Sequence, residues 1–170
     1  MFLSLDFVQK DARINLMAKL TCTKHGDKAN ELALYWYAQT EREIKAEAWF
    51  MAALALGAAL EAMLYAYYII WTGDEGSDPS KDEKLSDRLV LHDLIEAAKK
   101  ADLLSSVKFR DKFGEHAVED VITEIREMRN NVHAGVALRN DFNPAKFTKE
   151  RFTRLKGIFS GVADNVELKL

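Results

Sequence analysis

The stretch Trp49-Phe-Met-Ala-Ala-Leu-Ala-Leu-Gly-Ala-Ala-Leu-Glu-Ala-Met-Leu-Tyr-Ala-Tyr-Tyr-Ile-Ile-Trp71 decides the fold class. It contains mostly helix-forming residues, no proline and a single charge, Glu61. A helix that is apolar on every face is either buried on all sides or spans a membrane. Burial explains the many alanines, which let neighbouring helices approach closely, and a membrane span would carry the cost of placing Glu61 near its middle. We therefore expect the central helix of a bundle or a dimer and no membrane association.

The residues that precede this stretch extend the helical pattern toward the N-terminus. No glycine or proline lies between residue 28 and Trp49. We predict one long core helix over residues 28–71, with two helices jointed near Thr40 to Lys45 as the alternative. Residues 1–25 are predicted to form an N-terminal addition that contains a short amphipathic helix.

Three further helices are predicted in the C-terminal half, over residues 88–104, 114–138 and 147–167, because apolar residues recur there at intervals of three and four. The last of them has an apolar stripe of Phe152, Leu155, Phe159, Val162 and Val166. Half of the 16 residues in 72–87 are charged, so we expect a mobile loop there. The chain is thus predicted to be a single all-α domain over residues 1–170, a four-helix bundle with an additional N-terminal helix.

Composition and charge narrow the classes of function. A net charge of −3 argues against a protein that coats nucleic acid along its whole surface, but it leaves room for a local basic site. Cys22 is the single cysteine, so an internal disulfide is excluded and a cytoplasmic location is the expectation. Cys22 and His25 have the spacing of half a zinc site, but no second pair lies nearby. We expect no metal and no cofactor.

Four polar residues on the predicted helix 114–138 form the candidate site: Arg126, Arg129, Asn130 and His133. The apolar stripe of that helix consists of Val118, Val121, Ile122, Ile125, Met128 and Val132. At about 100° per residue, the four polar residues fall together on one flank of this stripe. Neither arginine has an acidic residue three or four positions away, so each needs an anion from elsewhere. A phosphate is one candidate, and a carboxylate of a neighbouring helix, first of all Glu61, is the other.

The segment Ile125-Arg-Glu-Met-Arg-Asn-Asn-Val-His-Ala-Gly135 resembles the signature of the HEPN superfamily. In that signature an arginine, often followed by a polar residue such as asparagine, precedes a histidine by four to six intervening residues. Arg126 has six residues before His133, whereas the more typical dipeptide Arg129-Asn130 has only three. Residues 53–65 resemble the small-residue helix of the family with its embedded Leu-Glu, and residues 91–104 resemble the helix that follows it.

This resemblance implies a metal-independent ribonuclease that dimerises, so that the signature helices of two chains build one site. His133 would exchange protons with a ribose 2′-hydroxyl or a leaving oxygen, and Arg126 and Arg129 would stabilise charge on the phosphate. Asn130 would orient His133 or the phosphate. The resemblance also implies an alternative, a non-catalytic interaction or scaffold module. The implied partners are a second copy of the chain, RNA and a small nucleotidyltransferase of a toxin–antitoxin or defence system.

Overall fold

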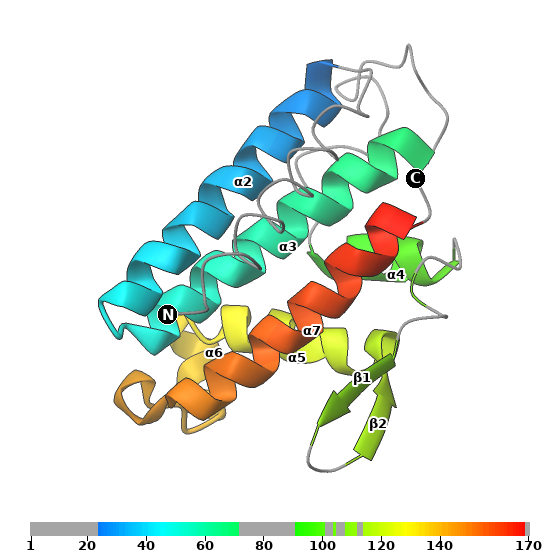
Figure 1. The fold of residues 1–170 in the computed structure, drawn as a ribbon. Coiled ribbons are helices and arrows are strands. Elements are labelled where there is room, and N and C mark those ends of the chain that lie inside the picture. The colour runs from blue at the N-terminus through cyan, green and yellow to red at the C-terminus, as the bar shows by residue number, and fades with distance from the viewer. Residues whose placement is uncertain (1–23, 72–90, 101–103, 105–107, 112–113, 169–170) are drawn as a thin grey trace, which may run out of the picture.

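The computed structural model describes residues 24–71, 91–100, 104, 108–111 and 114–168 (Figure 1). Six α-helices and one short β-hairpin make up this part of the chain, which confirms the predicted all-α class. The predicted N-terminal addition lies outside the described residues except for its last two, and so does the whole of the predicted loop 72–87.

Helices α2 (Lys24–Lys45) and α3 (Trp49–Trp71) form an antiparallel hairpin, so the predicted single helix over 28–71 is wrong. Helix α2 ends in a Schellman motif, in which the backbone N–H of Ala48 donates to Glu43 O (2.9 Å) and that of Glu47 donates to Ile44 O (3.0 Å). Glu47 takes the left-handed conformation that this motif requires, with φ 56°. The break therefore falls at residues 46–48, just after the alternative joint near Thr40 to Lys45.

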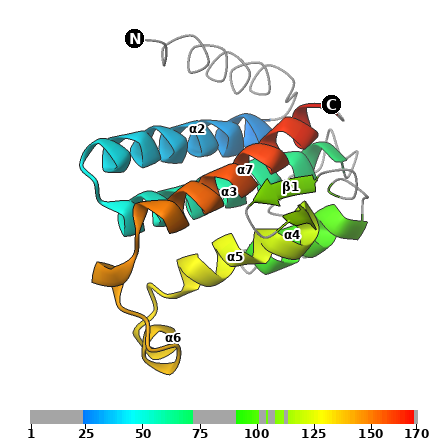
Figure 2. The same ribbon diagram turned by 60° about the horizontal axis from the view of Figure 1, so that its bottom comes forward.

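Helix α3 lies at the centre of the molecule and packs against α2, α4, α5 and α7 (Figures 1 and 2). Its buried residues are Ala52, Ala53, Ala55, Leu56, Ala59, Leu60, Met63, Leu64, Ala66 and Tyr67. Over Trp49–Tyr68 it is long and apolar enough to cross a membrane, a property that core helices share, and more than half of its most apolar stretch is buried. Burial among four neighbouring helices accounts for the apolar residues on all its faces.

The remaining core helices are α4 (Leu91–Lys100), α5 (Val118–Asn130) and α7 (Lys149–Leu168). Helix α7 agrees with the predicted helix 147–167, and the side chains of Phe152, Leu155, Phe159 and Val162 are buried as its stripe predicts. Phe159 stacks on Tyr37 of α2 with ring centroids 5.6 Å apart, which ties α7 to the hairpin. Helix α4 lies within the predicted helix 88–104, of which residues 88–90 and 101–103 are outside the described residues, and Leu104 is not helical.

The predicted helix 114–138 is three elements in the structure. Residues Gly114–Ala117 form strand β2, which pairs antiparallel with β1 (Lys108–Asp111) so that Phe109 lies opposite His116. Helix α5 follows, and a turn separates it from the short helix α6 (Ala134–Arg139). Helix α6 projects from the body of the molecule (Figure 2) and is followed by the 3₁₀ helix η2 (Pro144–Lys146).

Candidate functional site

Helix α5 carries three of the four predicted site residues, but it ends before His133. The backbone N–H groups of Asn131, Val132 and His133 each donate to the carbonyl three residues earlier, at 3.0–3.2 Å, which tightens the chain into a turn. His133 then has an extended backbone (φ −80°, ψ 120°) and begins α6. The predicted helical placement of His133 beside the arginines is therefore wrong, and so is the assignment of Val132 to the core, because that side chain is 58% exposed.

Arg129 forms an ion pair with Glu61. The sequence indicated this carboxylate as the alternative to a phosphate partner. Arg129 places its Nη2 2.7 Å from Glu61 Oε2. Its aliphatic stem crosses α3 at Gly57, where an added Cβ would meet Arg129 Cβ at 3.3 Å and Arg129 Cδ at 3.4 Å. Gly57 thus allows α5 to approach α3 closely, and Glu61, one turn further along the same face of α3, pairs with the guanidinium.

Arg126 faces a different helix and a different kind of partner. Its Nη1 lies 2.7 Å from Nδ1 of His92 on α4, and its buried Nε has no hydrogen-bond partner. An arginine nitrogen can only donate, so His92 Nδ1 is the acceptor and the neutral imidazole carries its proton on Nε2. Among the described residues, no carboxylate forms an ion pair with Arg126. His92 is the residue that sequence reasoning missed, because it lies 34 positions away and on another helix.

His133 and Asn130 have weaker structural ties than the arginines. The His133 side chain is exposed and makes no capping hydrogen bond to α6, and Asn130 is half-buried. Within the described part of the chain, the four predicted side chains form no hydrogen bond or ion pair with one another. In one chain, the structure therefore brings Arg126 to His92 and Arg129 to Glu61, and it leaves His133 beyond the end of α5.

The asparagine with a clear structural role is Asn131 rather than Asn130. Asn131 is buried, its Nδ2 donates to the carbonyl of Glu127 (3.0 Å), and its Oδ1 accepts from Nδ2 of Asn140 (3.1 Å). These bonds fix the end of α5 to the segment that follows α6. The Asn130-Asn131 pair was a signal for this helix end, since asparagine favours helix termini and turns over helix interiors.

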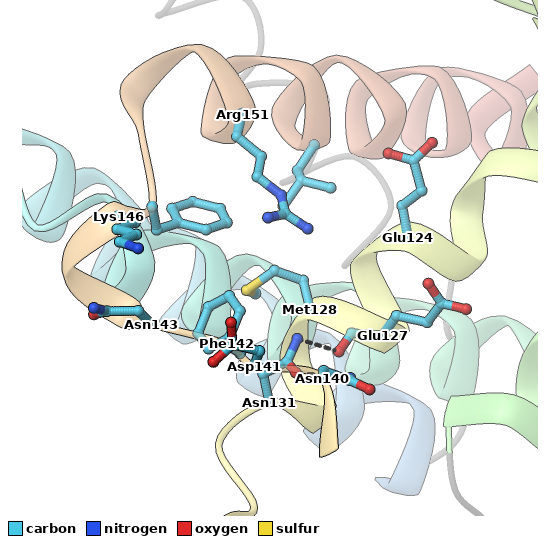
Figure 3. Close-up of a pocket in the computed structure, with 12 residues that line it drawn as sticks. Glu124, Glu127, Met128, Asn131, Asn140, Asp141, Phe142, Asn143, Lys146 and Arg151 are labelled. Atoms are coloured by element: carbon cyan, nitrogen blue, oxygen red, sulfur yellow. Dashed lines mark hydrogen bonds between the residues drawn. The ribbon is translucent and has the colours of Figure 1, made fainter. Parts of the chain in front are cut away.

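Two hollows flank α5 on different sides. A mainly apolar groove of about 420 Å³ runs between α2 and α3, lined by Leu32, Trp36 and Tyr65 and by the Glu61–Arg129 pair. A more polar cavity of about 330 Å³ lies between α5, the α6–η2 segment and α7 (Figure 3). Neither hollow is lined by Arg126 or His133.

Metal-ligating residues do not cluster in the described ranges, where no group of three or more His, Cys, Asp or Glu side chains is arranged to hold an ion. Cys22, half of the pair considered as a zinc site, lies outside the described residues.

Comparisons of this chain with models of known protein families, with curated proteins and with solved structures find no match. The resemblance to the HEPN superfamily thus rests on the residues between Ile125 and Gly135 and on the helices before them.

Proposed function

We propose that this chain is an RNA-binding domain, a HEPN-like four-helix bundle whose main phosphate contact is Arg126. The observation that carries the proposal is the pairing of the Arg126 guanidinium with a neutral imidazole instead of a carboxylate. Arginine keeps its charge at any ordinary pH, so this charge is available to an anion, whereas Glu61 neutralises that of Arg129. Arg126 also has the signature spacing to His133.

The exposed His133 suggests how bound RNA would be cleaved without a metal. A histidine removes the proton from a ribose 2′-hydroxyl, the 2′-oxygen attacks the phosphorus, and the bond to the 5′-oxygen breaks as a second group protonates that oxygen. The products are a 2′,3′-cyclic phosphate and a free 5′-hydroxyl. His133 is exposed, so we propose His133 of one copy as the base and His133 of a second copy as the group that protonates the 5′-oxygen. Arg126 would stabilise the charge on the phosphate, and His92 would position Arg126 through their hydrogen bond.

The family resemblance implies a site shared by two copies, and in one chain Arg126 and His133 form no hydrogen bond with each other among the described residues. Asn130 and Arg129 would support that site from the end of α5. We further propose a homodimer, a cytoplasmic location and, by the family resemblance, a nucleotidyltransferase partner in a toxin–antitoxin or defence system. Light scattering in aqueous buffer tests the first of these and should give about twice the 19.3 kDa chain mass. A monomer would remove the shared site, and a requirement for detergent would make α3 a membrane helix.

RNA binding is tested by fluorescence anisotropy with a labelled single-stranded RNA in EDTA. Arg126→Ala should weaken binding about tenfold, the effect of losing one charge-assisted contact. Arg42→Ala is the control, because Arg42 is also a helical arginine without an ion pair to the described residues, although its side chain is more exposed and bonds to Gln39. Equal affinities for wild type and Arg126→Ala would reject the phosphate contact.

Cleavage is tested on the same RNA, again in EDTA. If the domain is a ribonuclease, His133→Ala should abolish the cyclic-phosphate product while far-UV circular dichroism stays unchanged. His92→Ala, which removes only the partner of Arg126, should lower the amount of product without abolishing it. Loss of product with His92→Ala but not with His133→Ala would contradict the assignment of proton transfer to His133. Binding without any cleavage would leave the RNA-binding function and remove the enzymatic one.

A non-catalytic interaction module is the second candidate function, and the apolar groove between α2 and α3 favours it. Leu32 and Trp36 are exposed large apolar residues that line this groove, and Tyr35 is exposed nearby. Exposed apolar groups that gather in one groove are typical of protein-binding surfaces. Absence of RNA binding together with a dimer that Trp36→Ser dissociates would favour this function over the first.

A further inference from the structure

The polar cavity between α5, the α6–η2 segment and α7 has the dimensions of a small-molecule site (Figure 3). Its volume of about 330 Å³ is near the lower end of the range for such sites, which run from about 300 to 1,000 Å³. Met128, Phe142 and Leu155 contribute apolar surface, and charged and amide groups surround it. This mixture of an apolar surface with a few polar groups is typical of sites that orient a small ligand.

One wall of the cavity is cationic. Arg151 extends from α7 and its guanidinium points into the cavity (Figure 3), with its Cζ 5.4 Å from the ring centroid of Phe147. Within the described residues, neither Arg151 nor Lys146 of η2 forms an ion pair. Arg151 is therefore held over an aromatic ring without a carboxylate partner, and its planar donors match a carboxylate of a ligand.

Two glutamates of α5, Glu124 and Glu127, line another wall of the cavity. Among the described residues, Glu124 is paired with an arginine, and Glu127 is not. Glu124 accepts two hydrogen bonds from Arg154, at 2.9 Å to Nε and 2.6 Å to Nη2, so its charge is already neutralised. Partial burial raises the pKa of the Glu124 carboxyl, and the nearby Arg151 opposes that rise. Glu127 is exposed and forms no ion pair with the described residues, so its carboxylate remains able to bind a cation.

We propose that this cavity binds a small zwitterion of the size of a free amino acid, with its carboxylate on Arg151 and its ammonium group on Glu127. An aliphatic side chain of the ligand would lie against Met128 and Leu155. Lys146 and Asp141 add one charge of each sign, so the lining without the Glu124–Arg154 pair is electrically balanced. A balanced lining favours a ligand that carries both charges over a polyanion such as a nucleotide, whose phosphates would meet the glutamates.

The first experiment measures binding of leucine to the whole chain by isothermal titration calorimetry. Two further probes each lack one of the two charges: leucine amide has no carboxylate and 4-methylpentanoate has no ammonium group. Leucine should bind at least about tenfold more tightly than either, because each charge-assisted contact contributes about that factor. The other standard amino acids, tested one at a time in the same way, extend the search to other side chains.

The second experiment compares variants of the exposed wall residues, which are expected to fold normally. Arg151→Gln and Glu127→Gln should each weaken binding of the best amino acid by about tenfold. Arg139→Gln is the control, since Arg139 is an exposed arginine of α6 that does not line the cavity. The proposal is overturned if no amino acid binds at millimolar concentration, if Arg151→Gln binds as tightly as Arg139→Gln, or if adenosine monophosphate binds and every amino acid fails.

Discussion

Replacing Glu61 by glutamine removes the carboxylate that neutralises Arg129, and the cost can be worked out from the geometry. The two groups meet at 2.7 Å, with side chains that are 36% exposed for Arg129 and 25% for Glu61. At an effective dielectric constant of about 20, unit charges about 4 Å apart attract each other by roughly 4 kcal/mol. Desolvation and side-chain ordering oppose most of this, and well-exposed pairs retain only about 0.2–1 kcal/mol. For this partly buried pair we expect a coupling free energy of about 1 kcal/mol.

A double-mutant cycle isolates that coupling. The free energy of unfolding is measured by urea denaturation, followed by far-UV circular dichroism, for Glu61→Gln, Arg129→Gln and the double variant. Each single variant should lose about 1–2 kcal/mol, and the double variant should lose about 1 kcal/mol less than the sum. The control cycle uses Lys28 and Glu31, which also meet at 2.8 Å but have side chains 67% and 66% exposed. Their coupling should stay below about 0.5 kcal/mol.

A Glu61–Arg129 coupling no larger than that of the control pair would refute the reasoning, since Arg129 would then be held by its stem alone. The same variants also report on RNA. Glu61→Gln leaves the Arg129 guanidinium without its anion and removes a negative charge next to α5, so RNA affinity should rise by roughly threefold at low salt. A fall in affinity would show that Glu61 orients Arg129 for RNA, which the proposed division between the two arginines does not allow.

Two substitutions around the site, each with a control, and a fifth at the α2–α3 turn are tested by the free energy of unfolding in urea. Ile125→Ala truncates a fully buried side chain of α5 and should cost about 2–5 kcal/mol, whereas Val132→Ala, in the exposed turn, should change stability by less than about 0.5 kcal/mol. Asn131→Ala should cost about 1–3 kcal/mol because its two hydrogen bonds are lost, and Asn130→Ala should cost less. Glu47→Gly relieves a left-handed backbone at the α2–α3 turn and should stabilise the protein by about 0.5–1 kcal/mol; a loss of stability would contradict the strain assigned there.

The helical class and the central helix could be predicted because the sequence from Trp49 to Trp71 contains no proline and a single charged residue, Glu61. The turn before it could not. Residues Ala46, Glu47 and Ala48 are all good helix formers, and no glycine or proline marks the break. The chain turns there because folding α2 back along α3 buries apolar residues of both helices, a tertiary gain that overrides local helix preference.

Between residues 108 and 138, too, the local sequence predicted part of the structure and not all of it. The apolar positions of α5 itself were visible, and Ile122, Ile125 and Met128 are buried as the stripe predicts. The strand before the helix was missed because four residues are too few for a clear alternating pattern. The end of α5 at Asn130 was also missed, although the two consecutive asparagines were a local signal for it.

For the candidate site too, the features set by local sequence could be predicted, and those set by the packing of helices could not. Spacing along the chain showed that neither arginine has a partner on its own helix, and it named Glu61 as the first carboxylate to consider. Whether Glu61 pairs with Arg126 or with Arg129 depends on how α5 crosses α3. The spacing of residues along the chain does not determine this crossing. The contact of Arg126 with His92 likewise depends on the packing of α4 against α5.

Gly57 is the residue that separates the roles of the two arginines. Because it has no side chain, the stem of Arg129 lies directly on α3, and the guanidinium then reaches Glu61, four residues further along that helix. Arg126 is three residues earlier on α5. Three steps of 100° fall 60° short of a full turn, so Arg126 lies about 60° around the helix axis from Arg129, on the side that faces His92 of α4. A carboxylate meets the first arginine and an imidazole meets the second. Of these two arginines, Arg126 is therefore the one whose charge no described carboxylate compensates, and the proposed recognition of RNA depends on this charge.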